Sequence, residues 1–309
     1  MNFIYFGSSE FSQIVLEGLC RESFLPSLAV TKPDRPKGRG LKLSATAVSI
    51  FAETKGLALV KPQNLDEKSF KEKIRKINPE FFIVIDYGKI IPQDLLSLPK
   101  KFCLGLHPSL LPLYRGPAPI EYVLLKGDSY TGLTIFKLSQ QVDAGEIIFQ
   151  KRIPIETQDD HLSLSLKLAK EGAVFLVEGL KKIEDNKYKL TPQDELKASS
   201  THKFRKLDGL IDWQKSALDL RNQIRAMVGW PSAYTYYNGR MVKILKADIS
   251  GIENQSKPGQ IIGVNRQGID VTCGQGVLKI ISLKPEGKKT MDAWEFACGY
   301  RLKPGETYG

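Results

Sequence analysis

Residues 81–107 read FFIVIDYGKIIPQDLLSLPKKFCLGLH, and this stretch decides the fold. It begins with the continuous apolar run FFIVI and ends with a second run, FCLGLH, whose last residue is His107. Continuous runs of Val, Ile, Leu and Phe predict strands that are buried on both faces, as in a parallel sheet covered by helices. The ligands of such sheets bind outside the carboxyl ends of the strands, which is where His107 stands.

The same pattern recurs on both sides of this stretch. Further strand-like runs lie at 2–7, 28–30, 57–60 and 132–138, and segments with apolar residues at three- and four-residue spacing lie between them. The predicted fold class is therefore α/β, with a doubly wound and mostly parallel sheet.

The sequence pattern changes after a helical stretch at 161–182. A polar segment at 183–202 is typical of a linker, and from residue 203 onward short alternating strands are separated by turn sequences. We therefore predict a first domain at 1–182, a linker at 183–202, and a small OB-like β-barrel at 203–309.

Charge is the informative feature of the composition. The 309 residues carry a formal net charge of +11, and residues 201–309 hold 17 Lys and Arg against 10 Asp and Glu. Two interpretations stay open on charge alone. The basic residues form a well-solvated lysine-rich surface, or they bind a polyanionic partner whose phosphates release counterions when clustered Lys and Arg contact them.

Other features narrow the class of protein. No apolar run reaches the roughly 18 residues of a membrane span, and the first predicted strand begins at Asn2, so we expect no signal or transit segment and a cytoplasmic location of bacterial type. The four cysteines contain no Cys-x-x-Cys pair, which predicts free thiols in a reduced compartment and no metal site. We expect a monomer.

Three groups of residues are candidates for chemistry. His107 ends a strand and is followed by Pro108-Ser109-Leu110-Leu111-Pro112, a stiff loop suited to a flat apolar ligand. Asp143, in VDAGEI, is either a partner of His107 or only a turn-capping carboxylate, which is the commoner role before Gly. The segment TKPDRPKGRGLKLS (31–44) is a basic connector that suits a nucleic-acid backbone. The other two histidines, His161 and His202, are assigned surface roles.

These residues carry a specific resemblance. GLHPSLLPLYRGPAPI followed by VDAGEI resembles the signature of folate-dependent formyltransferases. PDRPKGRG, KPQNL, DYGKIIP, DGLIDWQKSA, VGWPSAYT and GYRLKPG extend the resemblance over nearly the whole chain, toward the members of the family that act on initiator tRNA. Members that formylate sugar nucleotides share the SLLP-x-YRG segment but generally lack the basic segment.

The resemblance implies transfer of the formyl group of 10-formyltetrahydrofolate to the α-amino group of initiator methionyl-tRNA, without a metal. Attack of the amine on the formyl carbon gives a tetrahedral intermediate that carries an oxyanion. The resemblance implies that His107 interacts with the amine or with this oxyanion, and that Asp143 holds His107 and assists proton transfer toward N10. The residues that it places beside the folate ring are Tyr87, Gly88, Ser109, Leu110, Leu111 and Pro112. The residues that it places on the tRNA are Arg35, Lys37, Arg39 and Lys42 in the first domain, together with the basic C-terminal barrel.

One position departs from the family pattern, which has Asn two residues before the histidine. Here that residue is Gly105, on the same side of the strand as His107. An Asn amide would donate a hydrogen bond to the developing oxyanion, and loss of such a donor costs about 10²–10³ in rate. We therefore expect slow turnover with binding largely intact. An introduced substitution, a natural variant with another donor, and a non-catalytic tRNA-binding protein all stay open, as does a formyltransferase for an amino sugar nucleotide.

Overall fold

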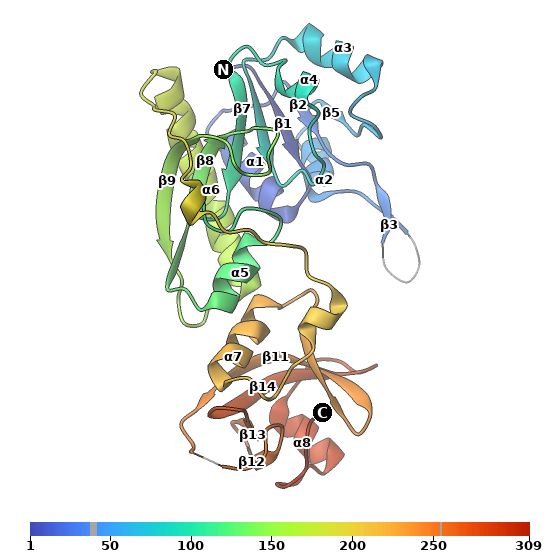
Figure 1. Cartoon of the computed structure of the whole chain (residues 1–309). Helices are drawn as coiled ribbons and strands as arrows, with labels where there is room; N and C mark the ends of the chain where they lie inside the picture. The colour runs from blue at the N-terminus through green and yellow to red at the C-terminus, as the bar shows by residue number, and fades with distance from the viewer. Residues whose placement is uncertain (38–41, 254) are drawn as a thin grey trace. The chain divides into compact units, whose positions relative to one another are not determined.

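The computed structural model describes residues 1–37, 42–253 and 255–309 (Figure 1). The chain divides into two compact units, each described by itself below. The first unit comprises Met1–Gly116, Tyr130–Pro154 and Ser165–Thr201, and the second comprises Pro117–Ser129, Ile155–Leu164 and His202–Gly309. In the part of the chain that the structure describes, no helix combines the length and the apolar character needed to cross a membrane.

The first unit is built on a seven-stranded sheet with the order β5-β2-β1-β6-β7-β8-β9. Its strands are β1 (Phe3–Gly7), β2 (Leu28–Val30), β5 (Leu59–Val60), β6 (Phe81–Ile85), β7 (Phe102–His107), β8 (Tyr130–Lys137) and β9 (Ile147–Pro154). The first five strands in the order are parallel, and β8 and β9 are antiparallel additions at one edge. The predicted α/β class with a mostly parallel sheet is confirmed.

Helices cover both faces of this sheet. They are α1 (Glu10–Arg21), α2 (Ala47–Thr54), α3 (Lys68–Ile77), α4 (Gln93–Leu96) and α6 (His161–Glu184), the first turn of which belongs to the second unit. On one face Gly18 of α1 lies against Ala173 of α6, and on the other Phe82 and Cys103 share a core with Phe70 of α3. Burial on both faces explains why the strand sequences are apolar without alternation.

The predicted basic connector at 31–44 contains a short β-hairpin. β3 (Arg35–Lys37) pairs antiparallel with β4 (Lys42–Ser44), and Pro36 lies opposite Leu43. At its base, the Lys61 ammonium lies 3.0 Å from an Asp34 carboxylate oxygen. The segment therefore has regular structure where the sequence indicated only a flexible loop, because two three-residue strands are too short to be recognised from alternation.

The second unit is built on an antiparallel sheet with the order β10-β11-β14-β13-β12, and β15 pairs with β14. Its strands are β10 (Ala233–Tyr237), β11 (Arg240–Ser250), β12 (Ile261–Asn265), β13 (Gly268–Thr272), β14 (Val277–Pro285) and β15 (Met291–Asp292), with α5 (Pro119–Lys126), α7 (Ala217–Ala226) and α8 (Ala293–Tyr300). The second domain, predicted as a small OB-like β-barrel, is present as this antiparallel sheet domain.

The C-terminal tail joins the two ends of this sheet. The Gly309 amide donates to the Tyr236 carbonyl on β10 (3.0 Å), and the Ile261 amide of β12 donates to the Glu306 carbonyl (2.8 Å). The tail therefore satisfies backbone groups on both outer strands, which would otherwise be free edges.

The two compact units divide the chain differently from the predicted domains at 1–182 and 203–309, which stay a prediction. Residues 117–129 and 155–164 belong to the second unit. The reason for the first is that α5 packs on α7, where Arg225 donates from Nη2 to the Leu124 carbonyl (3.4 Å). The predicted linker also belongs mostly to the first unit, since Thr191 exchanges two backbone hydrogen bonds with Ile147 (2.8 and 2.9 Å).

Candidate active site

His107 is the last residue of β7 and lies at the carboxyl end of the parallel strands. Its side chain is buried, and its Nε2 lies 2.8 Å from the Tyr114 carbonyl oxygen. A carbonyl only accepts hydrogen bonds, so Nε2 carries a proton in both charge states of the ring. The lone pair of the neutral ring is therefore on Nδ1.

Asp143 faces that lone pair. Its Oδ2 lies 3.6 Å from His107 Nδ1 and accepts a hydrogen bond from the Gly116 amide (2.8 Å). The backbone of Asp143 is in the left-handed region, with φ of 52°. Two acceptors thus face one another, an arrangement suited to a shared proton or to an N–H group of a substrate. The structure brings the two predicted catalytic residues together.

The loop after the histidine is anchored on the sheet. Ser109 is fully buried and donates to the Leu113 carbonyl (2.6 Å), and the Leu111 amide donates to Thr134 Oγ1 (3.1 Å). Leu111 is buried, and Leu110 packs over Gly132. The stiff loop that the prolines predict is present, but these two leucines face protein, and the exposed leucine of the loop is Leu113.

Gly105 lies beneath the ring of Phe136. The two residues are cross-strand partners of β7 and β8. A β-carbon on residue 105 would lie 2.7 Å from Phe136 Cζ and 2.8 Å from Leu138 Cδ1. The Phe136 ring is buried and stands edge-on to the His107 imidazole, with centroids 6.5 Å apart. The sequence offered no local reason for this glycine, whereas the structure supplies one: the ring occupies the space beside His107.

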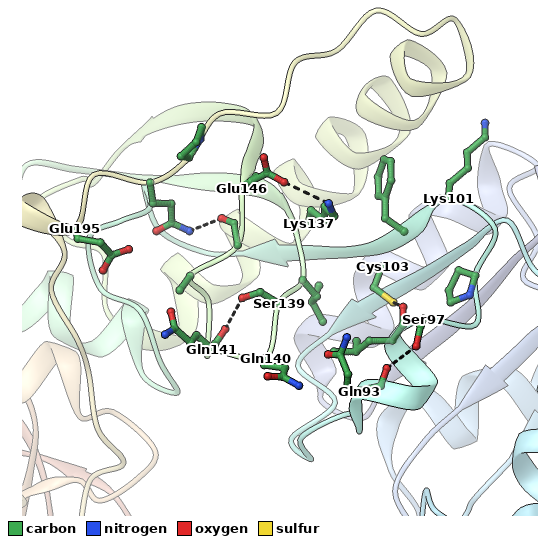
Figure 2. Close-up of a pocket in the computed structure, with 18 residues that line it drawn as sticks. Gln93, Ser97, Lys101, Cys103, Lys137, Ser139, Gln140, Gln141, Glu146 and Glu195 are labelled. Atoms are coloured by element: carbon green, nitrogen blue, oxygen red, sulfur yellow. Dashed lines mark hydrogen bonds and ion pairs between the residues drawn. The ribbon is translucent and has the colours of Figure 1, made fainter.

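A cavity of about 860 Å³ lies in the first unit (Figure 2). Its lining includes Ala144 and Gly145, which directly follow Asp143. The other lining residues are Gln93, Leu96, Ser97, Pro99, Lys101, Phe102, Cys103, Lys137, Leu138, Ser139, Gln140, Gln141, Glu146, Pro192, Gln193 and Glu195. Its volume lies within the roughly 300–1,000 Å³ of small-molecule sites.

The lining of this cavity carries both charged and neutral side chains. Lys137 and Glu146 form an ion pair (3.3 Å) along the lining (Figure 2). Burial raises the pKa of the Cys103 thiol to about 12, so this cysteine is a neutral side chain at physiological pH. Among the residues that the structure describes, no cluster of three or more His, Cys, Asp or Glu side chains could hold a metal ion.

The predicted folate residues Tyr87 and Gly88 lie in the turn after β6, and they do not line this cavity. The Tyr87 side chain is buried, burial raises its pKa to about 12, and its hydroxyl has no hydrogen-bond partner within the described residues. Gly88 has φ of 74°. The sequence analysis named none of the cavity residues at 93–103 and 192–195, because a strand, a helix and a linker carry no sequence motif that marks a cavity.

The predicted tRNA-binding residues lie on and around the β3–β4 pair. Arg35 is exposed on β3. Lys37 lies at the end of β3, Lys42 at the start of β4, and Arg39 lies outside the described residues. Lys32, just before the hairpin, approaches Gly88 with its side chain.

Two family models match the chain. A sequence model described as "Formyl transferase" matches residues 1–180, and one described as "Formyl transferase, C-terminal domain" matches residues 203–301. The matches define the class of protein as a formyltransferase.

Individual relatives narrow the class from formyltransferases in general to one family of them. The methionyl-tRNA formyltransferase of Dictyoglomus turgidum is 41% identical, over 100% of this chain and 99% of its own. That of Caldicellulosiruptor saccharolyticus is 39% identical, over 99% of each chain. This chain therefore belongs to the methionyl-tRNA formyltransferase family, and the resemblance indicated by its motifs is confirmed.

Solved structures share the fold. Methionyl-tRNA formyltransferase from Clostridium thermocellum aligns with a TM-score of 0.56 at 14% identity, over 82% of this chain and 95% of that one. HypX from Aquifex aeolicus in complex with tetrahydrofolic acid aligns with a TM-score of 0.64 at 17% identity, over 99% of this chain and 48% of that one. At these identities the likeness concerns the fold alone.

Proposed function

We propose that this chain transfers the formyl group of 10-formyltetrahydrofolate to the α-amino group of methionine on initiator tRNA. The observation that carries the proposal is the similarity to methionyl-tRNA formyltransferases over the full length of both chains. The pairing of His107 with Asp143 at the carboxyl end of the sheet supplies the chemistry. A tRNA substrate also implies that the protein works in the cytoplasm.

The reaction forms one bond, breaks one bond and moves one proton. The methionine nitrogen attacks the formyl carbon, the bond from that carbon to N10 breaks, and the proton of the amine ends on N10. His107 Nδ1 and Asp143 Oδ2 are the two acceptors positioned for that proton. The Tyr114 carbonyl keeps the other ring nitrogen protonated, so Nδ1 remains the basic atom of the neutral ring.

The folate donor fits the cavity beside Asp143. Side-chain amides, hydroxyls and backbone groups along the lining can meet the donors and acceptors of a pterin ring, and apolar residues such as Leu96 and Leu138 can cover its faces. A ligand there would extend to Ala144 and Gly145, next to the catalytic carboxylate. Tyr87, Gly88 and the Ser109–Pro112 loop do not line this cavity, and their contact with the donor stays a separate prediction of the family resemblance.

The tRNA would contact cations in both units. In the first, the proposal names Arg35, Lys37, Arg39 and Lys42 on the hairpin segment. In the second, the excess of basic residues would contact the phosphate backbone. These contacts position the substrate electrostatically.

Gly105 makes this form of the enzyme slow in our proposal. A glycine has no side-chain amide to donate to the oxyanion, and the apolar Phe136 ring beside it donates nothing either. Loss of one such donor typically costs about 10²–10³ in rate. Binding of tRNA and donor depends on other residues and would persist.

The test is single-turnover formylation of initiator methionyl-tRNA, with an amino sugar nucleotide offered in a parallel reaction. We expect formyl transfer to the tRNA alone, with binding that weakens as salt rises. Formylation of the sugar would place the chain with the sugar formyltransferases. Salt-sensitive tRNA binding that is unaffected by folate, with no transfer to either acceptor, would identify a non-catalytic tRNA-binding protein.

A further inference from the structure

The segment that sequence patterns predict to be a linker lies across the two catalytic loops. The Ser199 amide donates to the Pro112 carbonyl (3.1 Å), and the Arg115 amide donates to the Ser199 carbonyl (2.8 Å). Ser199 Oγ accepts a hydrogen bond from the Tyr114 amide (2.8 Å). We call residues 191–201 the strap, because they fasten the loop after His107 from outside.

Gln193 is the residue of the strap that reaches the other catalytic loop. Its Nε2 donates to the Asp143 carbonyl (2.8 Å) and to the Gly145 carbonyl (2.7 Å). Its Oε1 accepts from Arg115 Nε (2.9 Å) and Nη2 (2.8 Å). Carbonyls only accept and a guanidinium only donates, so the amide has a single orientation and uses its full hydrogen-bonding capacity.

Arg115 connects this amide to both catalytic side chains. The residue before it, Tyr114, holds His107 Nε2 through its carbonyl, and the residue after it, Gly116, holds the Asp143 carboxylate through its amide. The contacts form a closed ring that runs from the Asp143 backbone through Gln193, Arg115 and Gly116 to the Asp143 side chain. A shift of either loop must break at least one of these bonds.

Glu195 binds the Arg115 guanidinium from the solvent side. Its carboxylate forms two bonds with the Arg115 guanidinium, at 2.9 Å to Nη1 and 2.8 Å to Nη2. The Arg115 side chain is 11% exposed and the Glu195 side chain 69% (Figure 2 shows Glu195 at the cavity). Exposed ion pairs contribute little to stability. Lys197 offers a control on the same strap, because its side chain is 76% exposed, pairs with Asp194 (3.1 Å) and does not line the cavity.

We propose that Gln193 is a positioning residue that sets the spacing between His107 and Asp143 by tying the Asp143 turn to Arg115. The proposal rests on the proposed function for its kinetic consequence, but the geometry that it describes exists without substrate. Misplacement of a catalytic group by about 1 Å costs about 10²-fold in rate. Loss of the two N–H donors of Gln193 is therefore expected to lower kcat by roughly 10-fold to 10²-fold.

Two variants of Gln193 distinguish positioning through its hydrogen bonds from an effect of charge at this position. Gln193→Met is neutral, of similar length, and loses all four hydrogen bonds. Gln193→Glu keeps the acceptor for Arg115 and loses only the donors. We expect both to lower kcat at saturating substrates, while the KM for tRNA stays the same and Lys197→Gln leaves kcat within about twofold. An effect of Gln193→Glu alone would be an effect of charge and would overturn the proposal. A raised KM for the folate donor with unchanged kcat would make Gln193 a donor-binding residue only and would also overturn it.

A spectroscopic readout keeps the test independent of turnover. The chain has three histidines, so the ring ¹⁵N signals of His107 can be assigned by comparison with His107→Ala. In the substrate-free protein we expect Gln193→Met to change the His107 signals and to leave those of His161 and His202 in place. Unchanged His107 signals would overturn the proposal even if the enzyme proves inactive. If the signals change but tRNA is never formylated, the proposed function fails and the positioning role stands.

Discussion

Substitution of Gly105 by Asn, the residue of the family pattern, is the perturbation whose outcome the structure specifies most closely. A β-carbon at this position would lie 2.7 Å from Phe136 Cζ and 2.8 Å from Leu138 Cδ1, whereas carbon atoms pack at about 3.5–4.0 Å. The ring would therefore have to move by about 1 Å in a buried site. Overpacking of this kind costs about 1–3 kcal/mol.

The first measurement is the thermal midpoint of unfolding. A loss of 1 kcal/mol lowers the midpoint by about 2–4 °C in a domain of roughly 150–250 residues, so Gly105→Asn is expected to lower it by about 2–12 °C. Gly251→Asn is the matched control, because no atom lies within 4 Å of a β-carbon built there. We expect that control to change the midpoint by less than the Gly105 variant does.

Space for the amide can be created by shortening the ring side chain. In Gly105→Asn with Phe136→Leu, we expect the two substitutions to be less destabilising together than the sum of the single variants, with a coupling of about 0.5–3 kcal/mol. The double variant should also gain about 10²-fold or more in single-turnover formylation, because the amide can then reach the oxyanion. A Gly105→Asn protein as stable as its parent would refute the reasoning about space. A double variant with no gain in rate would refute the reasoning about a missing donor.

Three further predictions concern the site and the surface. Asp143→Asn should keep the fold but lower single-turnover formylation by about 10²–10⁴-fold, because an amide cannot take up the proton; unchanged turnover would remove Asp143 from the mechanism. Cys103 should resist alkylation at pH 8 while the exposed Cys298 is modified, as mass spectrometry of labelled peptides would show, because the Cys103 pKa lies near 12 instead of 9.0. Since the folded-state pKa of Cys103 is raised, its contribution to stability is present below pH 9 and is lost as the pH rises toward 12. Arg35→Ala should weaken tRNA binding and reduce the slope of log K against log salt by up to about 0.9, and an unchanged slope would exclude a phosphate contact.

The sequence alone predicted the elements that depend on local pattern. The apolar runs at 81–85 and 102–107 appear as β6 and β7, and the turn sequences of the C-terminal third separate the strands of an antiparallel sheet. His107 became a candidate because it ends a strand, whereas the turn of Asp143 left a capping role open and the family resemblance assigned this residue to His107. Local periodicity is sufficient for the strand assignments, since it reflects which faces of a strand or helix are buried.

The partners of these residues depended on the tertiary structure. That Gly105 accommodates Phe136 follows from the register of β7 against β8, and a register is a property of two strands that no single segment contains. The hydrogen bonds of Gln193 with Asp143 and Arg115 join three loops that are far apart in the sequence. The sequence therefore predicted which groups would carry the chemistry, and the folded chain decided what surrounds them, because side-chain contacts form only where strand pairing and loop closure bring distant segments together.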